Sequence, residues 1–206
     1  GRVMFLHIPT AKKLFKEAFG SSRLAVRRYA GYLYISGSAW EMEMVFDTAP
    51  YKIKAAIVEL CGRLPEEDEG FVAAKEGIQD IQERKELINE ETLLARYMRA
   101  KCVLTETPLV FDHKYRMYKL LQYQENRTFT LINAGLLALL DNREVDMEHG
   151  EGIPCGPCSE HASWMSSVYW HNECGTLCLL PSTLQKVQDR NILDVLRVIN
   201  FAKEME

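Results

Sequence analysis

The hydrophobic and polar positions of the 206 residues change period several times, and each change predicts a different element. The apolar run at 3–9 ends at a proline and predicts a buried strand. In residues 10–20, apolar positions recur at helical spacing between a capping threonine and a terminating glycine. Residues 32–46 predict a β-hairpin, because two β-rich runs flank a Ser-Gly-Ser turn and the second run alternates apolar and acidic residues.

The next elements decide the fold class. A second helix is predicted at 48–62, with Pro50 in its first turn and Gly62 at its end. One more strand at 70–76 would complete a ferredoxin-like β-α-β-β-α-β unit, although 69–88 also fits one long amphipathic helix.

Beyond residue 80 the pattern is mostly helical. Helices are predicted at 89–104, 113–124 (capped by Asp112), 134–141 (begun by Asn133 or Thr130) and 182–206, a short strand at 107–113, and a polar loop at 141–154. We therefore expect an α+β protein, in which a ferredoxin-like βαββα(β) unit precedes a mostly helical, zinc-stabilised C-terminal part. The expected regions are an α+β lobe at 1–80, a helical middle at 81–150 and a zinc-binding subdomain at 151–206.

Composition narrows the class of protein. The chain is 47% hydrophobic and 26% charged, as in an ordinary globular protein. No apolar run approaches the ~18 residues of a membrane-spanning helix, and the opening residues do not read as a signal peptide. Four of the six cysteines cluster, while Cys61 and Cys102 stand apart. That distribution favours one local site in a reducing compartment, so we expect a cytoplasmic or nuclear protein.

The cysteine cluster predicts a metal site. Cys155 and Cys158 lie in a Cys-Gly-Pro-Cys turn, and residues 159–174 are expected to form a helix. On that helix His171 and Cys174 would share a face, as would Cys174 and Cys178 if the turn continues. Thiolate and imidazole ligands from a turn and a helix end suit a tetrahedral zinc ion. We expect structural Zn²⁺ bound by Cys155, Cys158 and Cys174, with His171 or Cys178 as the fourth ligand.

The spacing from Cys155 to His171 resembles the first three ligands of a C2H2 zinc finger, with Val168 where such fingers place a core leucine. The pattern departs from those fingers at Ala162, which takes the usual aromatic position, and at the fourth ligand. The resemblance thus implies tetrahedral chemistry and not DNA binding, and an all-thiolate site fits the spacing equally well.

Other readings of the cluster stay open. Its Cys-Gly-Pro-Cys letters are those of a thioredoxin redox motif, four cysteines could hold an iron–sulfur cluster, and they could simply pack as small apolar residues. A nucleophilic cysteine with His161 or His171 as its base would make the chain an enzyme. The phosphate-binding and hydrolase motifs that would support an enzyme elsewhere in the chain are missing from the sequence.

The uneven distribution of charged residues along the chain suggests which partners it binds. Residues 1–63 carry ten Lys or Arg and five acids, whereas 64–100 carry five and ten. Arg23, Arg27 and Arg28 cluster beside tyrosines, which suits phosphates or an acidic protein surface. Glu41 and Glu43 would share one strand face, where paired acids are usually solvated.

Three functions follow from the sequence. We expect foremost a non-enzymatic intracellular interaction or regulatory protein with a protein partner. The alternative is an RNA- or DNA-binding regulatory protein that uses the basic N-terminal lobe, and the third reading is a cysteine-dependent enzyme.

Overall fold

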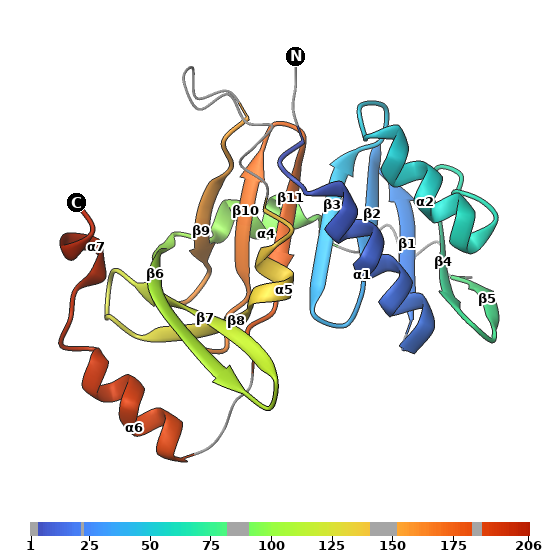
Figure 1. Cartoon of the computed structure of the whole chain (residues 1–206). Coiled ribbons are helices and arrows are strands. Elements are labelled where there is room, and N and C mark those ends of the chain that lie inside the picture. The colour runs from blue at the N-terminus through green and yellow to red at the C-terminus, as the bar shows by residue number, and fades with distance from the viewer. Residues whose placement is uncertain (1–3, 22, 82–90, 141–151, 183–186) are drawn as a thin grey trace.

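A computed structural model describes residues 4–21, 23–81, 91–140, 152–182 and 187–206. Within these residues the chain forms one sheet of 11 strands in the order β5-β4-β1-β2-β3-β11-β10-β9-β6-β7-β8, and neighbours pair antiparallel (Figure 1). The strands are β1 (Leu24–Tyr29), β2 (Tyr32–Ser36), β3 (Trp40–Val45), β4 (Glu69–Ala74), β5 (Gly77–Asp80), β6 (Cys102–His113), β7 (Arg116–Tyr123), β8 (Phe129–Asn133), β9 (Cys155–Ser159), β10 (Val168–Asn172) and β11 (Gly175–Leu179).

Short helices cover both faces of this sheet. They are α1 (Ile8–Ser21), α2 (Tyr51–Cys61), α4 (Leu93–Arg99), α5 (Ala134–Leu137), α6 (Val187–Leu196) and α7 (Phe201–Glu204). Helices α1, α2 and α5 lie on one face, which we call the front face, and α4 lies on the other, which we call the α4 face (Figure 1). No described helix is both long and apolar enough to cross a bilayer.

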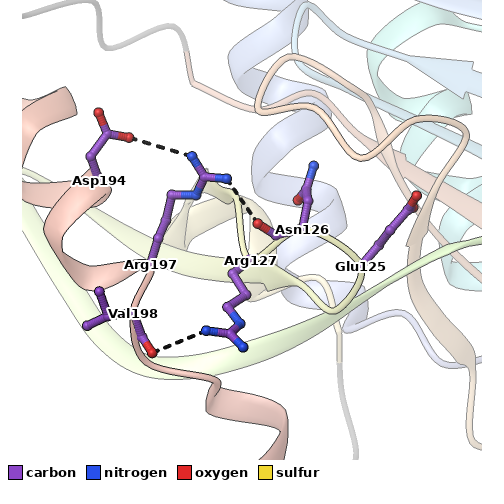
Figure 2. Close-up of a pocket in the computed structure, with 6 residues that line it drawn as sticks. All are labelled: Glu125, Asn126, Arg127, Asp194, Arg197 and Val198. Carbon is purple, nitrogen blue, oxygen red and sulfur yellow. Dashed lines mark hydrogen bonds and ion pairs between the residues drawn. The ribbon is translucent and has the colours of Figure 1, made fainter.

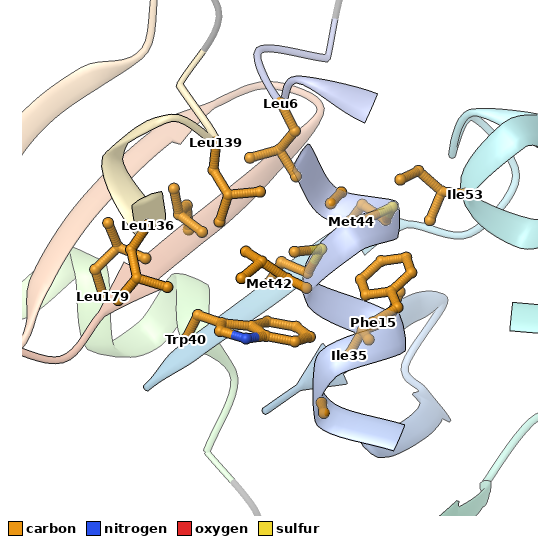
Figure 3. Close-up of a cluster of buried hydrophobic side chains, with 14 of the residues drawn as sticks. Leu6, Phe15, Ile35, Trp40, Met42, Met44, Ile53, Leu136, Leu139 and Leu179 are labelled. Atoms are coloured by element: carbon orange, nitrogen blue, oxygen red, sulfur yellow. The ribbon is translucent and has the colours of Figure 1, made fainter. Parts of the chain in front are cut away.

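The front face holds the main core. Alternate strand residues such as Ile35, Met42 and Met44 point toward α1 and α2, and the Phe15 ring lies 5.7 Å from the Trp40 indole (Figure 3). Gly37 makes room for that indole, since a Cβ at this position would lie 2.6 Å from it. Each large apolar side chain buried here contributes roughly 1.5–3 kcal/mol to folding.

Several local predictions are confirmed. Helix α1 contains the predicted 10–20 segment, β2 and β3 form the predicted hairpin, and α2 ends at Gly62 in the left-handed conformation. The predicted strand at 70–76 is β4, so the long helix at 69–88 is wrong. The Asn133 side chain accepts a hydrogen bond from the Gly135 N–H and caps α5. Of the predicted helix at 89–104, the start lies outside the described residues, α4 is capped by Thr92, and the end is wrong because β6 begins at Cys102.

The predicted fold class is wrong. The first element after residue 7 is a helix rather than a strand at 3–9, β1 was not predicted, and the sheet is far larger than a ferredoxin-like unit. The C-terminal part is not mostly helical, because the predicted helix at 113–124 is replaced by the end of β6 and by β7, and residues 155–179 contain β9, β10 and β11. Of the predicted helix at 182–206, the described residues form α6 and α7. The three proposed regions stay a prediction, and strands from each of them join the one sheet.

The last strands turn away from the rest of the sheet. Only Cys102 and Val103 of β6 pair with β9, and the remainder of β6 pairs with β7. The β6–β7 register shifts between Glu106 and Val110, as at a β-bulge, which bends a strand. The β6–β7 hairpin consequently projects past the front face toward α1 (Figure 1).

Candidate functional site

The predicted zinc ligands lie on strands instead of a helix. Cys155 and Cys158 belong to β9, His171 to β10 and Cys178 to β11, while Cys174 lies in the turn between β10 and β11. An irregular step in β9 sets Cys155 opposite His171 and Cys158 opposite Tyr169, so that both thiols face α4. Gly156 is required in this step, because a Cβ there would meet the Tyr169 carbonyl oxygen at 2.4 Å.

Directly paired residues form two rows across the α4 face. One row runs Glu41, Cys178, Tyr169 and Cys158; the other runs Glu43, Thr176, His171 and Cys155. Tyr169 thus separates two of the thiols, and His171 separates Cys155 from Thr176. In the part of the chain that the structure describes, no three His, Cys, Asp or Glu side chains are placed to share a metal ion. The zinc ion stays a prediction.

Glu43 holds the N-terminal end of α4. Its carboxylate is 1% exposed and accepts hydrogen bonds from the Tyr29 hydroxyl at 2.9 Å and from the backbone N–H groups of Leu93 at 3.0 Å and Leu94 at 3.3 Å. Two unpaired helical donors and the positive helix end therefore meet a carboxylate. The expectation that Glu41 and Glu43 share a face is confirmed, whereas the expectation that they are solvated is wrong for Glu43.

Glu41 and Arg96 hold the middle of the same helix. Arg96 donates to Glu41 at 3.0 Å and to the Tyr169 hydroxyl at 3.0 Å, and its guanidinium lies 3.8 Å from the Cys178 sulfur. Tyr34 donates to the other Glu41 oxygen. Because both charges are largely removed from water, loss of either side chain would leave the other charge poorly solvated and without its ion-pair partner.

Burial also shifts the pKa values of the cysteines and the histidine on the α4 face. It raises the pKa of Cys178 to about 12, with Glu41 adding to the effect, and raises the pKa of Cys158 to about 11, with Cys155 adding. Burial lowers the pKa of His171, whose ring stacks on Tyr97 at 4.8 Å and whose Nδ1 lies 2.8 Å from the Thr176 hydroxyl. These thiols and this imidazole are accordingly neutral near pH 7, and their contacts bind α4 to the sheet.

The three arginines that are predicted to bind a partner do not share one surface. Arg23 is exposed beside the β2–β3 turn, and the Arg27 guanidinium lies 5.5 Å from the Tyr34 ring centre on the α4 face. Arg28, one residue further along β1, faces the opposite side, stacks 3.6 Å from the Phe46 ring centre and pairs with Glu67 at 3.3 Å. Their role in binding stays a prediction, and two of the three have aromatic or acidic partners within the chain.

A feature that the sequence analysis missed lies at the tip of the β6–β7 hairpin. His113 pairs with Arg116, so Lys114 and Tyr115 alone form the loop, with φ values of 48° and 64°. Positive φ at both central residues is typical of a type I′ turn, which favours Asn-Gly. Each non-glycine residue held there costs about 1 kcal/mol. Tyr115 is fully exposed, at 105% of its reference surface.

The hairpin tip borders a groove on the front face. The groove has a volume of about 730 Å³ and lies between α1, the β2–β3 turn, the start of β7 and α5. Its wall includes Tyr115, Arg116 and Met117 from the hairpin, and Lys13 and Glu17 from α1. Apolar and small residues line part of the remainder, namely Leu14, Ala18, Ala39, Trp40, Ala134, Gly135, Leu136 and Ala138, and the polar residues Thr10, Ser21, Ser38 and Asn133 complete it. We call this region, together with Lys114 at the tip, the tip groove.

A second hollow, of about 540 Å³, lies where α6 meets the β7–β8 loop (Figure 2). Arg197 donates to the Asn126 carbonyl at 3.1 Å, and Arg127 donates to the Val198 carbonyl at 3.4 Å. Arg197 also lies 4.0 Å from Asp194. Since both guanidiniums bind backbone carbonyls across the junction, they attach the C-terminal segment to the sheet.

No family model matches the chain, and no curated protein matches it. Among solved structures, a match is the crystal structure of DNA polymerase III, beta chain, from Streptococcus pneumoniae TIGR4, with 11% sequence identity and a TM-score of 0.27. It covers 87% of this chain and 64% of that chain, so this chain spans less than two thirds of its length.

Proposed function

We propose that the chain is a non-enzymatic interaction protein that docks a protein partner on the tip groove. The observation that carries the proposal is Tyr115, an aromatic side chain with complete exposure in a left-handed turn. Such a residue gives the fold no apolar burial and costs backbone strain, so its benefit lies in contact with another molecule. Tyrosine at the edge of a groove is also a frequent anchor of protein interfaces.

The surroundings of Tyr115 support a protein ligand. Met117 beside it is 53% exposed, and the groove offers apolar and small residues flanked by charged ones. Interfaces combine an apolar centre and a polar rim in this way. We propose the cytoplasm or nucleus as the place of action, because all six cysteines are free thiols.

Photo-crosslinking tests the proposal. A benzoylphenylalanine at position 115 reports partners at the tip, and the same group at position 51 is the control, because Tyr51 on α2 is also exposed, at 75%. We expect position 115 to capture a protein that position 51 does not. The purified partner should bind at least about tenfold more weakly to Tyr115→Ala and equally well to Tyr51→Ala. Equal capture at both positions, or unchanged affinity of Tyr115→Ala, contradicts the proposal.

Nucleic-acid binding is the second candidate, and α1 and α2 favour it. These helices pack side by side on the front face and carry five lysines against two glutamates: Lys12, Lys13, Lys16, Lys52 and Lys54 against Glu17 and Glu59. In the described chain, no carboxylate lies within ion-pair distance of Lys12, Lys16 or Lys52. Lysines on a helical surface neutralise phosphates without reading sequence.

Fluorescence anisotropy with a short DNA duplex tests this candidate. The triple variant Lys12→Glu/Lys16→Glu/Lys52→Glu should weaken binding and reduce its salt dependence, whereas Tyr115→Ala should change neither. Absence of duplex binding by the unaltered chain at low salt excludes this candidate and leaves the tip groove proposal untouched.

A further inference from the structure

The tip groove has a definite chemical character. Part of its lining is apolar, since Leu14, Trp40 and Leu136 border it, and each of these side chains is under a tenth exposed because it also packs in the main core. Small side chains, among them Ala18 and Ala134, leave space above that part. A volume of about 730 Å³ lies within the range of sites that enclose a ligand segment. The groove therefore suits an apolar side chain inserted between the helices and the hairpin.

The rim of the groove is predominantly basic. Lys13 and Arg116 line it from opposite sides, Lys114 lies at the hairpin tip, and Glu17 is the acidic residue in the lining. All four are exposed. Of the carboxylates in the described residues, none lies within ion-pair distance of Lys13, Lys114 or Arg116. These cations are thus available to a ligand, and their sign selects an acidic one.

We propose that the tip groove binds an extended acidic peptide segment whose central apolar side chains enter the groove between α1 and the β6–β7 hairpin. This inference rests on the proposed function and names the chemistry of the partner. The basic rim steers and orients the segment, and the apolar centre supplies most of the affinity.

Fluorescence polarisation with the full chain tests the inference. The probe is the labelled heptapeptide Glu-Asp-Leu-Val-Ile-Asp-Glu. One comparison peptide replaces its acids with Lys and Arg, and another replaces its apolar centre with Gly-Ser-Gly. We expect the acidic apolar probe to bind at least about tenfold more tightly than either comparison peptide. Equal binding of the acidic and basic peptides, or no binding of the probe, overturns the inference.

Charge reversal assigns the binding to the groove. Lys13→Glu/Arg116→Glu should weaken binding of the acidic probe at least about tenfold, and Lys52→Glu, on the outer surface of α2, should leave it unchanged. Near-ultraviolet circular dichroism confirms that the variants fold. Equal losses in both variants would assign the binding to overall charge and overturn the inference. A dimer of the chain that the double reversal dissociates, with no probe binding, would make a second copy the occupant and overturn it as well.

The two tests fail separately. If position 115 captures a partner but the acidic probe does not bind, the docking surface stands and the peptide chemistry is wrong. If position 115 captures no protein, the proposed function fails at its own test, whatever the probe does.

Discussion

Tyr169 lies in the sheet and Tyr115 in the turn of one of its hairpins, and the two tyrosines differ in almost every respect. Tyr169 is 2% exposed, receives a hydrogen bond from Arg96 and lies between two thiols under α4. Tyr115 is fully exposed at a turn whose backbone it does not favour. The α4 face contains the residues that usually carry chemistry, and it uses them to hold a helix. The tip groove contains ordinary residues in an unusual arrangement, which is why we assign binding to it.

The largest loss of stability should come from Glu43→Ala, which alters the α4 face and leaves the tip groove intact. It removes a carboxylate that accepts hydrogen bonds from two backbone N–H groups of α4 and from the Tyr29 hydroxyl. We expect a loss of about 3 kcal/mol in the free energy of unfolding, measured with urea. Glu59→Ala on the exposed side of α2 is the control and should stay within about 0.5 kcal/mol. A small effect of Glu43→Ala would mean that α4 is held by its apolar contacts.

A smaller effect should come from the Glu41–Arg96 pair. Arg96→Met removes the cationic partner of the Glu41 carboxylate, and we expect a loss of about 2 kcal/mol in the free energy of unfolding. In a double-mutant cycle with Glu41→Gln, the coupling energy should be about 1 kcal/mol or more. Strict additivity of the two single variants would show that the pair does not contribute to docking α4. Affinity for a partner bound at Tyr115 should be unchanged in the folded variants.

Alkaline pH should destabilise the α4 face. An unfolded cysteine loses its proton near pH 8.5–9, whereas Cys178 keeps its proton in the folded chain up to about pH 12. Between these values the unfolded state binds fewer protons, so the free energy of unfolding falls as pH rises. From about pH 8 to about pH 10 the contribution of Cys178 should fall by about 1.5–2 kcal/mol. Cys178→Ala should therefore show a shallower decline than the unaltered chain, and parallel declines in the two proteins would refute the assignment.

A strand could be predicted from the sequence where only one of its two faces is buried. Where one face is apolar and the other polar, as in Trp40–Val45, the alternation predicted β3 and the shared face of its glutamates. In β7, Tyr118 and Leu120 pack toward α7, while Leu121 and Tyr123 pack into the main core. Two buried faces erase the alternation, and the run then resembles a buried helix.

The candidate sites were predictable from the sequence only in part. The cysteine spacing drew attention to residues 155–178, and the structure brings Cys155, Cys158, His171 and Cys178 to one face. Their roles depend on α4, which arrives from a distant part of the chain. Tyr115 carries no motif, since its turn lacks the Asn-Gly signal that identifies a type I′ hairpin.

The smallest stability effect gives the most direct test of the tip groove. Lys114→Asn/Tyr115→Gly supplies the residues that a type I′ turn favours and removes no buried contact. We expect the free energy of unfolding to rise by about 1 kcal/mol, while affinity for the partner captured at position 115 falls at least about tenfold. A more stable protein that binds its partner with unchanged affinity would contradict the assignment of the tip groove as the docking surface.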